Sequence, residues 1–234
     1  MLMRIKRNIK AIFMTGLLVC IFGSCTKEAV AEYGYISVSV STDLEIEDAA
    51  TKSEQLPESS FSEYNIALYN GEEQLWKTKY DIFLSDVQYN RVPAGIYTLE
   101  VESCTEEEAE TGNGKMRLFG SQQITVVAGR TADADILCQM VNARVTLAID
   151  QDFASDLLNT GASVTDGKRK LSLEVVDTDH VLERAVYYNV GDDETKNLVF
   201  TVTAGIISLD KVKAFDVPVR VEGGKWNKVT LKNL

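Results

Sequence analysis

Histidine is almost absent from this sequence: the 234 residues include one, His180, against 35 Asp and Glu. Triad hydrolases normally need a histidine to take the proton of the nucleophile, and zinc needs convergent Cys and His ligands. His180 follows Asp-Thr-Asp between two predicted strands, and we interpret it as an exposed turn residue. No Ser or Cys near it has the context of a nucleophile elbow. We therefore predict no catalytic residues and no enzyme activity.

Glycine-rich phosphate loops between a strand and a helix are also missing, so we expect no cofactor. Acidic runs occur at residues 106–110 and 192–194, but neither has the spaced pattern of a calcium loop, and we expect no metal site. Paired carboxylates of the kind that glycosidases use are available, as in any acidic protein, and indicate little.

Basic residues are scarce, with 24 Lys and Arg against the 35 acids. Four of the 24 lie within residues 1–24, which hold no acid, so the remaining chain has 20 basic residues against 35 acidic ones, a net charge of −15. Such an acidic surface argues against nucleic acid or anionic lipid as a partner.

A long apolar run occurs at residues 11–22, after a basic segment that holds Arg4 and Lys10. This pattern is typical of a secretory signal and is too short for a comfortable membrane span. The run ends in Phe22-Gly-Ser-Cys25, which resembles the lipobox of bacterial lipoproteins, where the cysteine becomes the first mature residue and carries acyl groups. An ordinary cleaved signal with an incidental cysteine is the alternative.

Cysteine is also rare. If Cys25 carries lipid and Cys20 leaves with the signal, Cys104 and Cys138 remain. An exported chain could join them as a disulfide. Cys138 alternates with apolar residues, however, so a buried free thiol is equally compatible with the pattern.

Alternating polar and apolar residues dominate the rest of the chain and predict short strands. In residues 33–41, for example, Ser37 and Ser39 alternate with Ile36 and Val38. Further strands are predicted at 63–70, 74–80, 97–101, 123–127, 131–139, 143–150, 170–176, 181–188, 198–203, 213–221 and 226–231. Residues 43–60 are interpreted as a loop, and only residues 152–159 have a helical pattern.

Glycine marks the predicted turns. Asn70-Gly71 predicts a hairpin, and similar turns at residues 92–97, 127–129 and 222–224 indicate repeated hairpin construction. Many short strands with almost no helix predict an all-β fold of two antiparallel β-sandwich domains with Greek-key connections. We place a signal peptide at 1–24, a tether at 25–32, an N-terminal sandwich at 33–141 and a C-terminal sandwich at 142–234.

Tryptophan occurs twice, at Trp76 and Trp226. Together with the tyrosines, these rings could form a platform on which sugars stack. The alternative is that both belong to the core or to strand edges.

Several of these motifs together resemble a Bacteroidetes-type family of small surface lipoproteins of unknown function, grouped with fimbrillin-like and cell-adhesion proteins. The resemblance implies transthyretin-like or immunoglobulin-like sandwiches and attachment to the outer membrane. In some members it also implies polymerisation by strand exchange after cleavage in the first loop. That cleavage usually follows Arg, whereas Lys52 stands here. The matching segments are 22–25, 33–40, 50–52, 92–99, 124–130 and 138–146.

The sequence thus predicts a non-enzymatic, lipid-anchored protein of the outer membrane and cell surface, either adhesin-like or an accessory fimbrial component. Its partners would be the membrane, through Cys25, and other fimbrial subunits or surface glycans and proteins. The alternative function is a glycan-binding lipoprotein of a nutrient-uptake system, using Trp76 or Trp226.

Substitution of the lipobox cysteine tests the anchor. We expect Cys25→Ser to move the protein from the membrane fraction to the soluble fraction, because the acylated side chain is lost. Metabolic labelling with a fatty acid and sedimentation measure this. A variant that is still labelled and still sediments would refute the lipobox interpretation.

Overall fold

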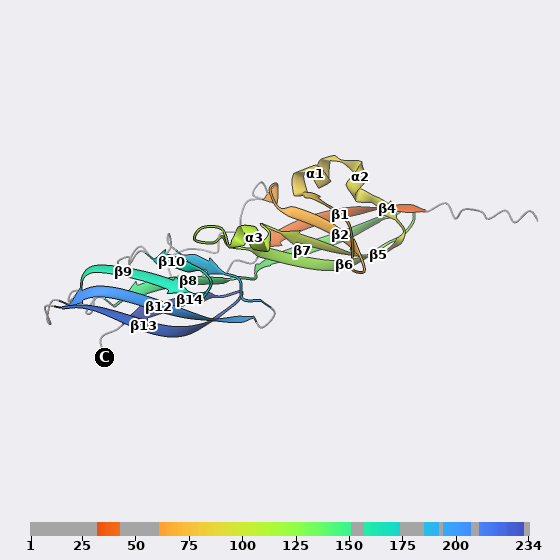
Figure 1. Cartoon of the computed structure of the whole chain (residues 1–234). Coiled ribbons are helices and arrows are strands. Elements are labelled where there is room, and N and C mark those ends of the chain that lie inside the picture. Colours follow the sequence, from red (N-terminus) through yellow and green to blue (C-terminus); the bar gives the residue numbers. More distant parts are fainter. Residues whose placement is uncertain are drawn as a thin grey trace, which may run out of the picture. The chain divides into compact units, whose positions relative to one another are not determined.

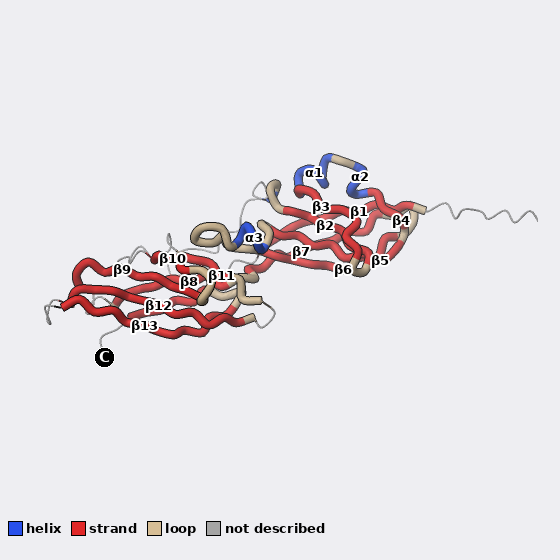
Figure 2. The backbone as a smooth tube through the Cα atoms, in the orientation of Figure 1, coloured by secondary structure: helices blue, strands red, loops and turns tan. Residues whose placement is uncertain are grey.

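A computed structural model of the chain describes residues 32–42, 61–150, 157–173, 185–191, 194–206 and 211–231. Strands dominate these residues, and the helices among them are short (Figures 1 and 2). The signal peptide (1–24), Cys25, the tether up to residue 31, Lys52 and His180 lie outside the described residues. Within the described ranges, no helix is long and apolar enough to cross a membrane.

The N-terminal sandwich has two layers. One has the order β3-β2-β5-β6 and the other β7-β1-β4, and they join where the end of β7 pairs with the start of β6. The strands are β1 (Tyr33–Thr42), β2 (Asn65–Asn70), β3 (Glu73–Lys79), β4 (Arg91–Pro93), β5 (Gly95–Glu102), β6 (Leu118–Val126) and β7 (Thr131–Met140).

The C-terminal sandwich has one layer in the order β10-β9-β12-β13 and another in the order β11-β8-β14. Its strands are β8 (Ala143–Ile149), β9 (Leu157–Thr165), β10 (Lys170–Leu173), β11 (Val186–Tyr188), β12 (Thr195–Ile206), β13 (Lys211–Glu222) and β14 (Trp226–Leu231).

The two sandwiches repeat one topology, with β1 to β7 corresponding in order to β8 to β14. The layer β3-β2-β5-β6 is repeated as β10-β9-β12-β13, and β7-β1-β4 is repeated as β14-β8-β11. In both, the first strand runs parallel to the last: residues 35–42 pair with 131–138, and residues 144–149 pair with 226–231. The other strand pairs in the described part of the chain are antiparallel.

The predicted all-β fold of two sandwiches is therefore confirmed, with one parallel pair in each. An immunoglobulin constant-type sandwich places its first, second, fifth and fourth strands in one sheet. Here the first, fourth and seventh strands share a layer instead. This strand order excludes the immunoglobulin constant-type topology, and of the two topologies that the sequence predicted, the transthyretin-like one remains.

Each sandwich has its own core. Ile36 and Val38 of β1 are buried whereas Ser37 and Ser39 are exposed, as the alternation predicts. The N-terminal core further includes Ile66, Leu68, Tyr97, Leu99, Val101, Ile124, Val126 and Ile136, and the C-terminal core includes Val145, Val164, Leu173, Tyr188, Leu198, Phe200 and Val221.

The glycine turns divide into two kinds. The hairpin predicted at Asn70-Gly71 joins β2 to β3, with Gly71 at a φ of 61°. The turns at 92–97 and 222–224 instead join β4 to β5 and β13 to β14, strands of opposite layers that do not pair with each other. The turn at 127–129 joins β6 to β7, which pair antiparallel at the ends far from the turn, Leu118 with Met140 and Phe119 with Gln139. The hairpin interpretation is therefore wrong for 92–97 and 222–224, because a sandwich needs corners at which the chain changes layer. At 127–129 it is correct in that β6 and β7 are consecutive antiparallel partners, although the residues next to the turn do not pair.

Three short helices were not predicted: α1 (Tyr80–Ser85), α2 (Val87–Asn90) and α3 (Glu106–Ala109). A capping box of Thr105 and Glu108 begins α3, so that part of the acidic run is a helical turn. The helix predicted at 152–159 is wrong for Leu157 onward, where β9 begins, and residues 151–156 lie outside the described ranges.

Cys104 and Cys138 are buried free thiols in the structure. Burial raises the pKa of both, that of Cys138 to about 12. The Cys138 Sγ lies 3.8 Å from the Val101 carbonyl oxygen, and the Cys104 Sγ lies 3.8 Å from that of Met116. Of the two states that the sequence left open, a disulfide or free thiols, the structure therefore has free thiols.

A partly buried ion pair holds the turn between β9 and β10. The Asp166 side chain is 4% exposed and lies 2.9 Å from the Lys196 Nζ. Burial alone would raise its pKa, but hydrogen bonds from the Arg169 and Lys168 amides and from Lys196 lower the pKa to about 2. A carboxyl whose pKa is depressed on folding stabilises the fold above its unfolded pKa.

We predict that Asp166→Asn lowers the free energy of unfolding at neutral pH by about 2 kcal/mol. The difference from the parent should be complete above about pH 4 and lost by about pH 2, since the carboxyl of the parent becomes protonated across that window. Urea unfolding across this pH range measures it. Glu222→Gln, which removes an exposed partner of Lys225, is the matched control. A pH-independent difference would contradict the prediction.

Candidate functional site

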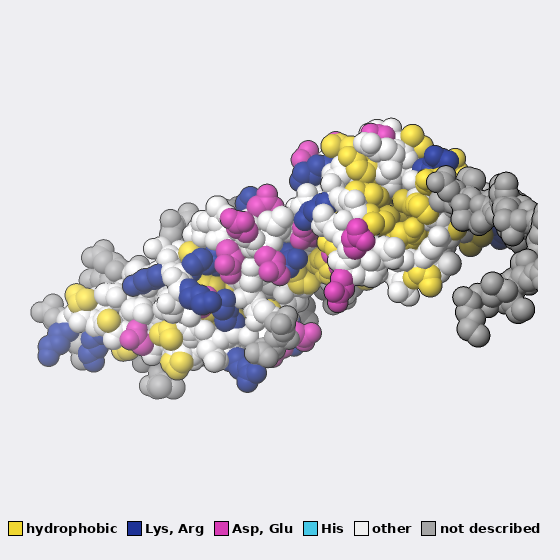
Figure 3. Space-filling model, turned by 45° about the vertical axis from the view of Figure 1, so that its right-hand side comes forward, with side chains coloured by type: hydrophobic (Ala, Val, Ile, Leu, Met, Phe, Trp, Pro, Cys, Tyr) yellow, Lys and Arg dark blue, Asp and Glu magenta, His cyan; other side chains and the backbone are white. Residues whose placement is uncertain are grey.

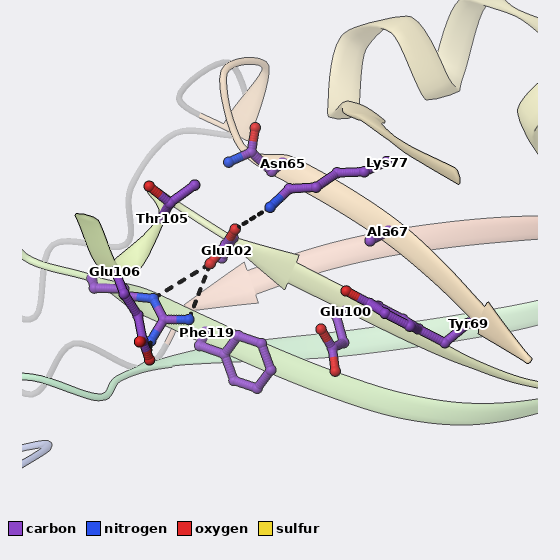
Figure 4. A pocket seen from close by; sticks show the side chains of 10 residues that line it. Asn65, Ala67, Tyr69, Lys77, Glu100, Glu102, Thr105, Glu106 and Phe119 are labelled. Atoms are coloured by element: carbon purple, nitrogen blue, oxygen red, sulfur yellow. Dashed lines mark hydrogen bonds and ion pairs between the residues drawn. The ribbon is translucent and has the colours of Figure 1, made fainter. Parts of the chain in front are cut away.

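A hollow of about 260 Å³ lies on the outward face of the β3-β2-β5-β6 layer, next to the start of α3 (Figure 4). All four strands contribute to its lining. The strand periodicity explains why. Because Ile66 and Leu68 of β2 face the core, Ala67 and Tyr69 face outward, and the same alternation turns Glu102 of β5 outward.

Strand register brings the lining residues together. Ala67 pairs with Lys77 on one side and Glu100 on the other, and Glu102 pairs with Phe119 of β6. Directly opposed side chains on one face lie within contact distance of each other. Ala67 is small, so longer side chains surround a low point on the sheet.

Glu102 is the centre of a network of charges. One carboxylate oxygen lies 2.6 Å from the Lys77 Nζ, and the other accepts hydrogen bonds from Arg117 Nη2 at 3.1 Å and Nε at 3.4 Å. Arg117 Nη1 also lies 3.0 Å from Glu106. The Glu102 and Arg117 side chains are only 12% and 16% exposed, so this pair is more shielded from water than an ordinary surface ion pair.

Two aromatic rings complete the lining. The Arg117 guanidinium lies 5.5 Å from the centre of the Phe119 ring, within the range of a cation–π contact. The Tyr69 hydroxyl donates to Gln74 Oε1 at 3.1 Å. Burial, followed by the charge of Glu100, raises the pKa of Tyr69. Glu100 lies between the Tyr69 and Phe119 side chains (Figure 4).

The groups that line the hollow can form hydrogen bonds and apolar contacts with a ligand. Carboxylates accept hydrogen bonds, Lys77 and Arg117 donate them, and the rings offer apolar faces. In the part of the chain that the structure describes, no group of three or more His, Cys, Asp and Glu residues could hold a metal ion.

The two tryptophans that were considered as a sugar-stacking platform lie in different sandwiches. Trp76 of β3 packs against the N-terminal core, with Phe83 and Tyr89 at ring distances of 5.9 and 5.5 Å. Trp226 of β14 donates from Nε1 to Thr146 at 2.8 Å, and the Arg144 guanidinium lies 4.5 Å from its ring centre. Both rings are half-buried against their own neighbours, and neither lines the hollow.

Of the residues that line the hollow, the sequence analysis considered Glu106, within the acidic run 106–110, and only as a calcium ligand, which it rejected. The alternation that places Leu99 and Val101 in the core already turns Glu100 and Glu102 outward, and this signal was available. Arg117 and Phe119 were harder to find, because β6 was predicted from residue 123 and begins at Leu118.

Solved structures with distant similarity come mainly from Bacteroides. A candidate cell adhesion protein of Bacteroides eggerthii is 10% identical with a TM-score of 0.44, covering 86% of each chain. Candidate polysaccharide-binding proteins of Bacteroides thetaiotaomicron are 12% identical with a TM-score of 0.43, covering 79% of this chain and 80% of that one. A fimbrial protein of Bacteroides ovatus is 8% identical with a TM-score of 0.40, covering 86% of this chain and 49% of that one. All three TM-scores are below 0.5.

Family comparison gives a clearer result. None of the curated proteins matches the chain. The family described as Domain of unknown function (DUF4493) matches residues 32–234, which include both sandwiches. The chain therefore belongs to the DUF4493 family.

Proposed function

We propose that this protein is a lipid-anchored, non-enzymatic component of the bacterial outer membrane that acts at the cell surface by binding, in the manner of an adhesin or an accessory fimbrial subunit. The observation that carries the binding role is the hollow around Glu102, whose lining residues are hydrogen-bonding and aromatic groups. The anchor rests on the lipobox-like segment that ends at Cys25.

Exposed apolar surface on the N-terminal sandwich also supports a binding role. Acidic and basic side chains are mixed over the visible face, and hydrophobic side chains gather over part of the N-terminal sandwich (Figure 3). Leu84 and Val87 of the α1–α2 segment are 60% and 59% exposed. Contiguous exposed apolar surface often marks a place where another protein docks.

The fimbrial form of the proposal requires that β1 can be replaced by a strand of another subunit. β1 lies between β7 and β4, and its side chains Ile36 and Val38 fill the core. A donor strand would have to supply apolar residues at the same alternate positions. Cleavage after Lys52 would release β1 for such an exchange.

Protease shaving of intact cells, followed by mass spectrometry, tests the location. We expect chymotrypsin, which cuts after aromatic residues and Leu but not after Lys, to release fragments of both sandwiches while the lipidated segment at Cys25 stays with the cells. A released chain that starts at Ser53, together with ladders of oligomers, would support the fimbrial form. Permeabilised cells and a periplasmic marker protein serve as controls. An intact chain that is cut only after permeabilisation would overturn the surface location.

A further inference from the structure

We propose that the hollow around Glu102 is a binding site for a neutral saccharide ring. This site gives the binding role proposed above a ligand class. It rests on that proposal only for the location of the sugar, at the cell surface. It places the sugar on Tyr69, Glu100 and Phe119, and not on the two tryptophans.

The charges of the hollow favour a neutral ligand. Glu100, Glu102 and Glu106 face Lys77 and Arg117, which leaves one negative charge in excess. Both cations are already engaged by Glu102, and Arg117 also by Glu106. An anionic ligand would have to displace these carboxylates from the cations and would meet the excess negative charge, so phosphates and uronic acids are disfavoured.

The hydrogen-bonding groups match hydroxyls. Ionised carboxylates accept hydrogen bonds and cannot donate them, so they need a ligand with donors. Glu100 takes part in no ion pair among the described residues; the Tyr69 hydroxyl is its hydrogen-bond partner in the hollow, and its second oxygen can accept from a ligand. Its side chain lies between those of Tyr69 and Phe119 (Figure 4). Sugar hydroxyls supply donors at the edge of a ring that also has apolar C–H faces. One such ring can satisfy a carboxylate and contact Tyr69 or Phe119 at the same time.

The size of the hollow fits one ring. Its 260 Å³ lies just below the range of about 300–1,000 Å³ that is usual for drug-sized ligands. For a ligand this small in an open site, the dissociation constant should be on the order of 1 mM. Several copies of the protein anchored on one surface would bind a polymeric glycan far more tightly through multivalency.

The second copy of the topology provides an internal comparison. The corresponding outward face of β10-β9-β12-β13 presents short hydroxyls such as Ser163, Ser172 and Thr201. Thr201 is engaged by Asp216 at 2.7 Å, and the described outward positions of these strands carry no aromatic ring. The proposed site therefore belongs to the N-terminal sandwich alone.

Saturation-transfer NMR on the full chain in mild detergent tests the proposal. The probes are neutral methyl glycosides of common hexoses and pentoses, with glucuronate as the anionic comparison. We expect transfer to the neutral probes, and a response to glucuronate that is weaker by about fivefold.

Two variants locate the binding. Tyr69→Ala and Glu100→Gln should each weaken it by about fivefold, since one removes an aromatic face and the other a charged acceptor. The matched controls are Tyr35→Ala and Glu73→Gln, which change exposed residues outside the hollow and should leave binding unchanged. Glu102 is left intact, because removing it would strand two partly buried cations. Glu100→Gln preserves shape, so it remains informative if Tyr69→Ala fails to fold.

The proposal is overturned if no neutral probe shows transfer, if glucuronate binds better than the neutral sugars, or if Glu100→Gln binds like the parent. These results would leave the surface location untouched, because protease shaving measures that separately. Equally, an inward-facing protein that binds neutral sugars would overturn the surface location and leave the site in place.

Discussion

The parallel pairing of the first and last strands is the constraint on which each sandwich depends. β1 pairs with β7, and β8 pairs with β14. Because β1 and β7 lie about a hundred residues apart in the sequence, their layer is complete only when these distant segments meet. The absence of a side chain at Gly34 makes this pairing possible. A Cβ at this position would lie 2.4 Å from the Val127 carbonyl oxygen, so only glycine allows β1 to lie against the β6–β7 corner. The remaining layer then packs against this frame.

The hollow is a consequence of that arrangement. Once Leu99, Val101 and their neighbours face the core, alternation forces Glu100 and Glu102 onto the outer face, where register sets them beside Lys77 and Phe119. The same topology in the C-terminal sandwich has short hydroxyl side chains on this face. The two copies of one topology thus differ in their outward residues, which the core does not constrain.

Local patterns predicted the strands well and their connections less well. The alternation around Ile36 and the hairpin at Gly71 depend on neighbours in sequence, and both were confirmed. The corners at residues 92–97 and 222–224 have hairpin-like sequences, but which layer a strand joins depends on pairings distant in sequence. The repeat of one topology in the two sandwiches could not be predicted either, because it too depends on pairings between strands distant in sequence. The Glu102 site was missed because its partner Arg117 lies beyond an intervening loop.

Hydrogen exchange of backbone amides in the native chain tests this account most directly. The amides that β1 and β8 contribute to their parallel pairs, such as that of Tyr35, which donates to the Arg130 carbonyl at 2.8 Å, should be among the slowest to exchange. Those of the exposed α2 turn should exchange much faster. If the β1 amides exchange as fast as those of α2, β1 is not the strand that closes the sandwich, and the account fails.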